Sequence, residues 1–203
     1  MRLDTSDSTA TDLLVGLRFE ESHAAWVEFH QRYLPIIVAF ARRLGLDDAD
    51  ANDVGQETMI AFLRDCRTGR FDPSRGRLRS WIFTNVRFRI ADLHRRRARR
   101  EVLLSEESSV DSTEAFTPEM ESFWNQERDA VILHHALVKL ECESRLDRQT
   151  LDAFRMTAII GLAARDVAHA MNMAPADVYM AKRNVMRRLR DILPHVERLY
   201  DAG

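Results

Sequence analysis

The sequence predicts an all-α protein, built from two small helical domains that are joined by a flexible acidic linker. Apolar residues recur at spacings of three and four along most of the 203 residues, and no segment shows a convincing strand-like alternation. Only seven glycines and five prolines interrupt these patterns. The hydrophobic content of 45% is enough for buried cores, and the aromatic content of 8% favours aliphatic ones.

The predicted N-terminal domain, residues 1–100, starts with a long amphipathic helix over 22–44. Ser22 is placed to cap the start of this helix, and Gly45 is placed to end it. Pro35 lies inside the run and cannot donate a backbone hydrogen bond, so a kink or a break is expected there.

Two further helices are predicted in this domain, over 49–65 and 77–98, with a loop containing Gly and Pro between them. Aspartates lead into the helix at 49–65, as suits a helix start, whereas Gly55 inside it is a poor helix former. The side chains expected to face inward are Val54, Thr58, Ala61 and Phe62 in the first helix and Ile82, Val86, Ile90 and Leu93 in the second.

The predicted C-terminal domain, residues 127–203, follows a linker at 101–126. Residues 101–129 hold nine acids and one arginine, and their Ser, Thr and Glu content is typical of a flexible connector. A short helix is expected near Glu119–Trp124. Helices then resume over 128–144 and 147–160, and two shorter ones follow.

The net charge of −2 conceals two basic segments. Residues 70–100 carry eleven arginines against two acids, yet they also contain one tryptophan and three phenylalanines. The second basic cluster consists of Lys182, Arg183, Arg187, Arg188 and Arg190. An Arg-rich coding preference explains why arginine replaces lysine, but it does not explain the clustering. The charge pattern therefore predicts two basic surfaces with an acidic connector between them.

Residues 161–193 have the spacing of a helix-turn-helix. Ala168 is small where the two helices approach each other, and Asn172 can adopt the left-handed conformation of the turn. Val178 falls where the second helix reaches the core. Ala163 and Ala174 occupy the helix starts, where Ser or Thr would cap better.

The outward face of the second helix carries side chains suited to base edges in the major groove, where Arg and Asn make bidentate contacts with guanine and adenine. These are Tyr179, Met180, Lys182, Arg183, Asn184, Arg187 and Arg188. The alternative is an ordinary basic helix of a bundle with a solvated arginine face.

In the helix at 77–98, Trp81, Asn85 and Phe88 lie on a different face from the inward stripe, with arginines beside them. Exposed rings next to guanidinium groups suit single-stranded nucleic acid, because bases stack on rings while arginine neutralises the backbone. The alternative places Trp81 and Phe88 in the core, and a core position is favoured for Phe83.

One stripe of the helix at 49–65 is polar. It consists of Asp53, Gln56, Glu57, Ile60 and Arg64, opposite the inward face. Such a stripe is either a solvated helix face or a surface for a partner that displays arginines.

Two motifs taken together resemble bacterial RNA polymerase sigma factors of the extracytoplasmic-function (ECF) type. They are "DVGQETMIAFLRD" (53–65) and "RFDPSRGRLRSWIFTNVRFRIADLHRRRARR" (70–100), and an acidic linker and a helix-turn-helix follow them. The similarity covers about 12–100 and 128–193. It implies a promoter-specificity subunit that binds core RNA polymerase and takes part in promoter recognition, DNA melting and transcription initiation.

The resemblance also assigns roles to residues. The surface for the clamp helices of the polymerase β′ subunit would be Asp53, Gln56, Glu57 and Ile60. The loop at 71–76 would hold a flipped base of the −10 element, and the helix after it would melt that element, through Phe71, Asp72, Ser74, Arg75, Arg77, Trp81, Asn85, Phe88 and Arg89. The −35 element would be read by Tyr179, Met180, Lys182, Arg183, Asn184 and Arg187. The C-terminal domain would sit on the β flap.

Two other classes of function fit the sequence less well. An ordinary helix-turn-helix regulator would have no reason to carry the pattern of 53–89. An enzyme is disfavoured, because the seven histidines show no metal-ligand spacing and no phosphate loop or nucleophile elbow appears. No cofactor or metal is therefore expected. Cys66 and Cys142 form no CxxC pair.

The expected partners are core RNA polymerase and promoter DNA, both duplex and single-stranded. An anti-sigma factor is a further candidate, and the sequence does not name one. The N-terminal residues lack the apolar segment of a signal peptide, and no membrane-spanning run is present, so a cytoplasmic location is expected.

Overall fold

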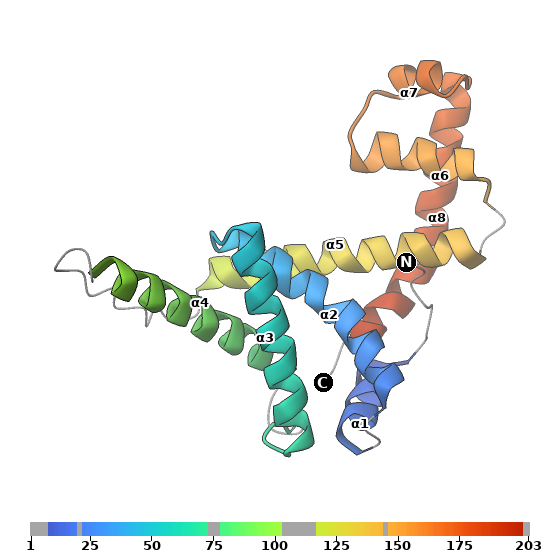
Figure 1. Cartoon of the computed structure of the whole chain (residues 1–203). Helices are drawn as coiled ribbons and strands as arrows, with labels where there is room; N and C mark the ends of the chain where they lie inside the picture. Colours follow the sequence, from blue (N-terminus) through green and yellow to red (C-terminus); the bar gives the residue numbers. More distant parts are fainter. Residues whose placement is uncertain (1–7, 20–21, 73–77, 103–116, 144–145, 201–203) are drawn as a thin grey trace. The chain divides into compact units, whose positions relative to one another are not determined.

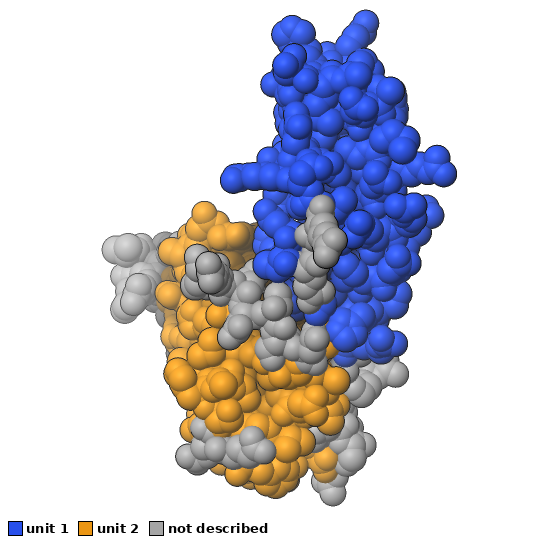
Figure 2. All heavy atoms as spheres, turned by 90° about the vertical axis from the view of Figure 1, so that its right-hand side faces the viewer, with its two compact units in different colours: residues 1–5, 132–198 blue, residues 6–131, 199–203 orange. Residues whose placement is uncertain are grey.

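A computed structural model describes residues 8–19, 22–72, 78–102, 117–143 and 146–200. These residues form eight α-helices, one π-helix and no strand (Figure 1), so the predicted all-α class is confirmed. The chain divides into two compact units (Figure 2). The described residues of unit 1 lie within 132–198, and those of unit 2 lie within 8–131 and 199–200. Most of the predicted linker, 103–116, falls outside the described residues.

Unit 2 is a helical bundle. Its helices are α1 (Ala10–Phe19), α2 (His23–Arg43), α3 (Asp48–Arg67), α4 (Leu78–Val102) and the first part of α5 (Pro118–Glu143). Within it, α1, α2 and α3 contact one another, and α4 contacts both α2 and α3. The sequence interpretation missed α1.

The helix ends of unit 2 follow the local signals in the sequence. Ser22 accepts a hydrogen bond from the Ala25 amide at 3.2 Å, as predicted for an N-cap. At the start of α3, Asp47 accepts one from the Asp50 amide at 2.9 Å. Gly45 follows α2 with a φ of 94°, a conformation that suits glycine. A kink or a break is expected at Pro35 from the sequence; α2 is not broken there, since it runs from His23 to Arg43.

Most buried residues of unit 2 are aliphatic, as expected, but a cluster of aromatic rings lies among them. Phe62 is central: its ring stacks on Phe29 with centroids 4.7 Å apart and meets the edges of Phe71 and Trp81 at 5.1 Å. The chain has few aromatic residues overall, but several of them are concentrated in this cluster. Such ring pairs stabilise beyond the area that they bury, by ~0.5–1.5 kcal/mol each.

A second aromatic cluster ties α5 to unit 2. Trp124, only 2% exposed, meets Phe40 edge-on with centroids 5.5 Å apart, and Phe40 also contacts Phe83. Arg43 adds a hydrogen bond to Gln126 at 2.7 Å. The short helix predicted near Glu119–Trp124 is therefore the start of a longer one, and helix formation resumes before the predicted residue 128.

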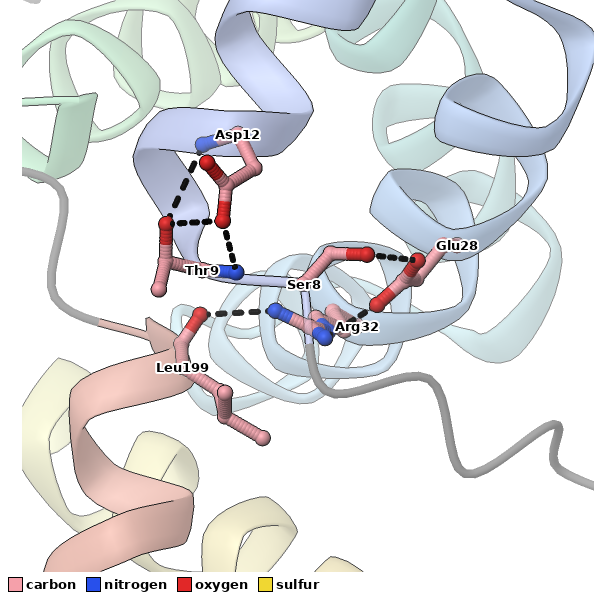
Figure 3. A network of polar contacts seen from close by, with 6 residues as sticks. All are labelled: Ser8, Thr9, Asp12, Glu28, Arg32 and Leu199. Carbon is pink, nitrogen blue, oxygen red and sulfur yellow. Dashed lines mark hydrogen bonds and ion pairs between the residues drawn. The ribbon is translucent and has the colours of Figure 1, made fainter.

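The last described residues of the chain, Leu199 and Tyr200, also belong to unit 2. Arg32, buried at 4% exposure, donates a hydrogen bond to the Leu199 carbonyl at 2.8 Å and pairs with Glu28 (Figure 3). Tyr33 donates one to the Tyr200 carbonyl at 3.2 Å. A buried arginine is costly unless its charge is paired, so these contacts explain how Arg32 is tolerated in the core.

Unit 1 contains the remainder of α5 with α6 (Arg148–Phe154), η1 (Arg155–Ile159), α7 (Ala164–Ala170) and most of α8 (Pro175–Tyr200). Asp147 caps α6 by accepting a hydrogen bond from the Thr150 amide at 2.7 Å, and this bond lowers the pKa of the Asp147 carboxyl. The helix predicted over 147–160 becomes π-helical in its second part. The last helix is 26 residues long, so the expectation of two short helices there is wrong for α8.

Candidate nucleic-acid interface

The polar stripe of α3 lies on the outside of unit 2. Asp53, Gln56 and Glu57 are exposed, and Ile60 is 63% exposed although it is apolar. Gln56 lies 3.3 Å from His30 of α2, measured from Oε1 to Nε2. The opposite face is buried as predicted, at Val54, Thr58, Ala61 and Phe62. Four adjacent side chains therefore form one accessible surface with an apolar member.

Two faces of α4 are distinguished by burial. Ile82, Val86 and Ile90 are buried as predicted, and so is Phe83, for which a core position was favoured. Phe88 is 66% exposed, with the Arg95 guanidinium 5.8 Å from its ring centroid. An exposed ring next to a cation can stack on a base while the cation meets the backbone.

Trp81 is neither a fully exposed ring nor a fully buried core residue. Its side chain is half-buried, and the ring meets Phe62 edge-on at a dihedral angle between planes of 71°. One turn further on, the half-buried Asn85 donates a hydrogen bond to the Trp81 carbonyl at 3.0 Å. Part of the indole therefore contributes to the core while the rest is accessible.

The loop between α3 and α4 is described only at its start. Phe71 is buried at 4% exposure against Phe62, and a ring held there cannot stack on a base without leaving the core. Asp72 is half-buried. The other predicted residues of this loop, Ser74, Arg75 and Arg77, lie outside the described residues.

Ion pairs join the acids of α3 to the arginines of α4. Arg89 Nη1 pairs with Glu57 Oε2, and Arg97 Nη2 pairs with Asp50 Oδ2. A third arginine of α4, Arg79, pairs with Glu121 of α5. The sequence interpretation placed Glu57 and Arg89 on two different binding surfaces and gave no sign that they touch.

Unit 1 carries the helix-turn-helix geometry in α7 and α8. Asn172 adopts the left-handed conformation with a φ of 52°, as predicted for the turn. Val178 is 1% exposed, and it shares a core of small aliphatic residues with Ala153, Val167, Ala168 and Ala181, so aliphatic packing holds in this unit. Ala163 caps α7 without a side-chain hydrogen bond, as expected for alanine.

The outward face of α8 is accessible. Lys182, Arg183 and Arg187 are exposed, as are Tyr179 at 65% and Met180 at 50%. Asn184 is half-buried and accepts a hydrogen bond from Arg187 at 3.4 Å. The predicted set for duplex reading therefore lies along one helix, with its donors directed away from the aliphatic core.

Several features bear on other classes of function. Among the described residues, no group of three or more His, Cys, Asp or Glu side chains could hold a metal ion. Cys66 and Cys142 are both free thiols, and burial raises the pKa of the Cys66 thiol. No helix in the described part of the chain is long and apolar enough to cross a membrane.

Comparison with known proteins gives a match to part of unit 2. Residues 29–100, which contain the α3 stripe and α4 up to residue 100, match the Sigma-70 region 2 family. This segment is therefore similar to Sigma-70 region 2 domains.

A curated protein is similar to part of the chain. The chain is 31% identical over 91 residues to the ECF RNA polymerase sigma factor RpoE of Cereibacter sphaeroides, a match that covers 43% of this chain and 49% of that protein. The chain thus spans about half the length of the relative that it matches. Both matches agree with the resemblance to ECF-type sigma factors that the sequence motifs indicate.

Proposed function

We propose that this protein is an ECF-type sigma factor that binds core RNA polymerase, recognises two promoter elements and helps to open the DNA between them. The proposal rests on how two surfaces lie on the segment that matches the Sigma-70 region 2 family. An accessible polar stripe on α3 lies beside a helix that presents Phe88 and several arginines. A ligand-sensing domain of an ordinary regulator has no need of exposed rings among arginines.

In this proposal the α3 stripe of Asp53, Gln56, Glu57 and Ile60 docks on the clamp helices of the polymerase β′ subunit. Three polar side chains and an exposed isoleucine follow one another along the stripe, and a polar surface with an apolar member suits a protein interface. The acidic members suit a partner surface that displays arginine or lysine.

The α4 helix and the loop before it would engage the −10 element as it opens. Phe88 and the accessible part of Trp81 stack on unpaired bases, and Asn85 and Arg89 lie on the same helix. Phe71 anchors the start of the loop in the core, and Asp72, Ser74, Arg75 and Arg77 would surround a flipped base. Base stacking on a ring contributes ~1–3 kcal/mol, comparable to the cost of unstacking a weak step.

The C-terminal domain, residues 127–203, would read the −35 element as a duplex and sit on the polymerase β flap. Its base-contacting side chains would be Tyr179, Met180, Lys182, Arg183, Asn184 and Arg187. Two contacts of moderate affinity, one from each domain at either side of the linker 101–126, reinforce each other through effective concentration. A cytoplasmic location and an anti-sigma partner fit this function.

Run-off transcription with purified core RNA polymerase and a library of genomic fragments tests the proposal. New transcription start sites should appear only when the protein is added, and the chain should co-purify with core polymerase. If it binds promoter-like duplexes but neither binds core polymerase nor creates start sites, the ordinary-regulator alternative replaces the sigma-factor proposal.

A further inference from the structure

The two helices that carry the proposed polymerase and DNA surfaces are joined by ion pairs, one of which links the two surfaces directly. Arg89 of α4 belongs to the proposed DNA set, and Glu57 of α3 belongs to the proposed polymerase set. Further along, Arg97 of α4 pairs with Asp50 and lies 3.8 Å from Asp47. Two arginines of the basic helix are thus occupied by carboxylates of its neighbour.

The Arg89 pair is partly shielded from water. The Arg89 side chain is 22% exposed, and its Nε atom is buried without a hydrogen-bond partner among the described residues. The Glu57 side chain is 52% exposed and can turn away from α4. Glu57 is therefore the movable member of a pair whose arginine is held against the helix surface.

The Arg97 pair has the opposite distribution of exposure. Arg97 is 49% exposed, whereas Asp50 is only 15% exposed and lies in the first turn of α3. This arginine is the member that can move to another anion. In both pairs a carboxylate oxygen occupies guanidinium donors that can also bind a phosphate oxygen, because arginine binds the two groups with the same donors.

We propose that Glu57 and Asp50 act as internal phosphate mimics, which hold Arg89 and Arg97 and weaken DNA binding by the free protein. DNA must displace these carboxylates before its phosphates reach the guanidinium groups. Partly exposed ion pairs are weak, so each should reduce affinity by about two- to five-fold.

Glu57 also couples the two surfaces, and this step rests on the proposed function. A polymerase group that takes the Glu57 carboxylate releases Arg89 for DNA. Because coupling between binding sites is reciprocal, a DNA phosphate that takes Arg89 also releases Glu57 for the polymerase. Each partner therefore favours binding of the other through one side-chain exchange.

The displacement is measured on the full chain without polymerase. The probe is a fluorescently labelled single-stranded oligonucleotide of mixed sequence and about 20 nucleotides, longer than the ~4–16 nucleotides of a typical single-strand site. Fluorescence anisotropy gives the Kd for the wild type, Glu57→Gln and Asp50→Asn. Both variants should bind about two- to five-fold more tightly than the wild type.

Asp48→Asn is the matched control. Asp48 lies on α3 in the same turn as Asp50 and also pairs with an arginine, but its partner is Arg42 of α2, at 2.7 Å. The control removes the same charge without freeing an arginine of α4. Its Kd should change by less than about 1.5-fold, since it lacks the local pair that the proposal invokes.

Two further readouts separate displacement from a general charge effect. The slope of log Kd against log salt should steepen by about 0.7 for each freed arginine that meets a single-strand phosphate. In an Arg89→Gln background, Glu57→Gln should produce no gain, because no arginine remains to be released.

The proposal is overturned if neither variant gains affinity, if Asp48→Asn gains as much as they do, or if the Glu57→Gln gain persists without Arg89. Failure of the proposed function is a separate result, namely a wild-type chain that does not bind core polymerase. The oligonucleotide measurements do not depend on that outcome.

Discussion

A Cβ atom placed on Gly55 would lie 2.8 Å from Cγ2 of Val38, closer than carbon atoms normally approach. Gly55 is in the middle of α3, where glycine is the poorest helix former after proline. The sequence alone makes this residue a weakness of the helix. In the folded unit it is what allows α3 to approach α2.

Gly55→Ala should therefore destabilise the protein, by roughly 1–2 kcal/mol, although alanine favours the helix by about 1 kcal/mol. Val38 is branched and buried at 6% exposure, so it cannot simply rotate away. Thermal unfolding followed by circular dichroism measures the change. The cost of Gly55→Ala should shrink in a Val38→Ala background. A more stable Gly55→Ala variant would show that the helices can separate without cost.

Phe88→Ala should impair promoter opening while it leaves the fold intact. The ring is 66% exposed, so its removal should cost less than about 0.5 kcal/mol of stability. A lost stacking contact of ~1–3 kcal/mol corresponds to about 5- to 150-fold in open-complex formation. Permanganate reactivity of unpaired thymines, with core polymerase on a promoter recovered from the run-off library, measures the opening.

Phe19→Ala is the control for this experiment. Phe19 lies on α1, is 70% exposed, and has Arg18 5.0 Å from its ring centroid, much as Arg95 lies near Phe88. Equal losses from the two variants would contradict a specific role of Phe88. Trp81→Ala is a poorer probe, because its ring also packs on Phe62 and its removal changes the core.

Asn172→Gly should leave the stability of unit 1 within about 0.5 kcal/mol of the wild type, whereas Asn172→Ala should lower it by about 1 kcal/mol. The φ of 52° at this position is strained for alanine and freely available to glycine. Amide hydrogen exchange in α7 and α8 reports the local stability. Similar protection in both variants would show that the turn relaxes to another conformation.

The stability of unit 2 should fall at alkaline pH through Tyr200. Burial raises the pKa of its hydroxyl from 10.0 to about 12, so the unfolded chain loses this proton at a lower pH than the folded one. The contribution is complete below pH 10 and is lost as pH rises toward about 12. At about pH 11 the free energy of unfolding should be reduced by roughly 1 kcal/mol.

Tyr200→Phe keeps the ring and removes the titration, so its stability should decline less between about pH 9 and 11 than that of the wild type. Tyr179→Phe, at an exposed position, serves as the comparison and should follow the wild type. Parallel curves for all three proteins would assign the alkaline loss to other groups.

Local signals explain what the sequence predicted well. Ser22 and Gly45 act within one turn of the residues that they cap or end, and Asn172 acts on its own backbone. The inward stripes of α3 and α4 follow from the helical period. The helical period alone does not show which of Trp81 and Phe88 is buried, because both lie on a face at the border of the core. The position of Phe62 decides which of the two rings is covered.

Contacts between distant segments explain what the sequence did not predict. Arg89 and Glu57 are 32 residues apart, and no local pattern pairs them. Trp124 lies among Glu, Ser and Asn residues, so composition placed it in a linker, although one large ring in such a segment is enough to dock a helix. The missed α1 contributes buried apolar residues to unit 2, and it contacts α2 and α3, which are distant from it in sequence only in part.

The hydrogen bonds from Arg32 and Tyr33 to the carbonyls of Leu199 and Tyr200 have a genetic consequence. A nonsense codon near position 199 would spare every base-contacting residue proposed on α8, yet it would strip the buried Arg32 of a carbonyl partner. Such an allele would damage the domain that contains Arg32, 167 residues earlier in the chain. Unit 2 is therefore completed only once Leu199 and Tyr200 have been translated, long after the rest of its helices.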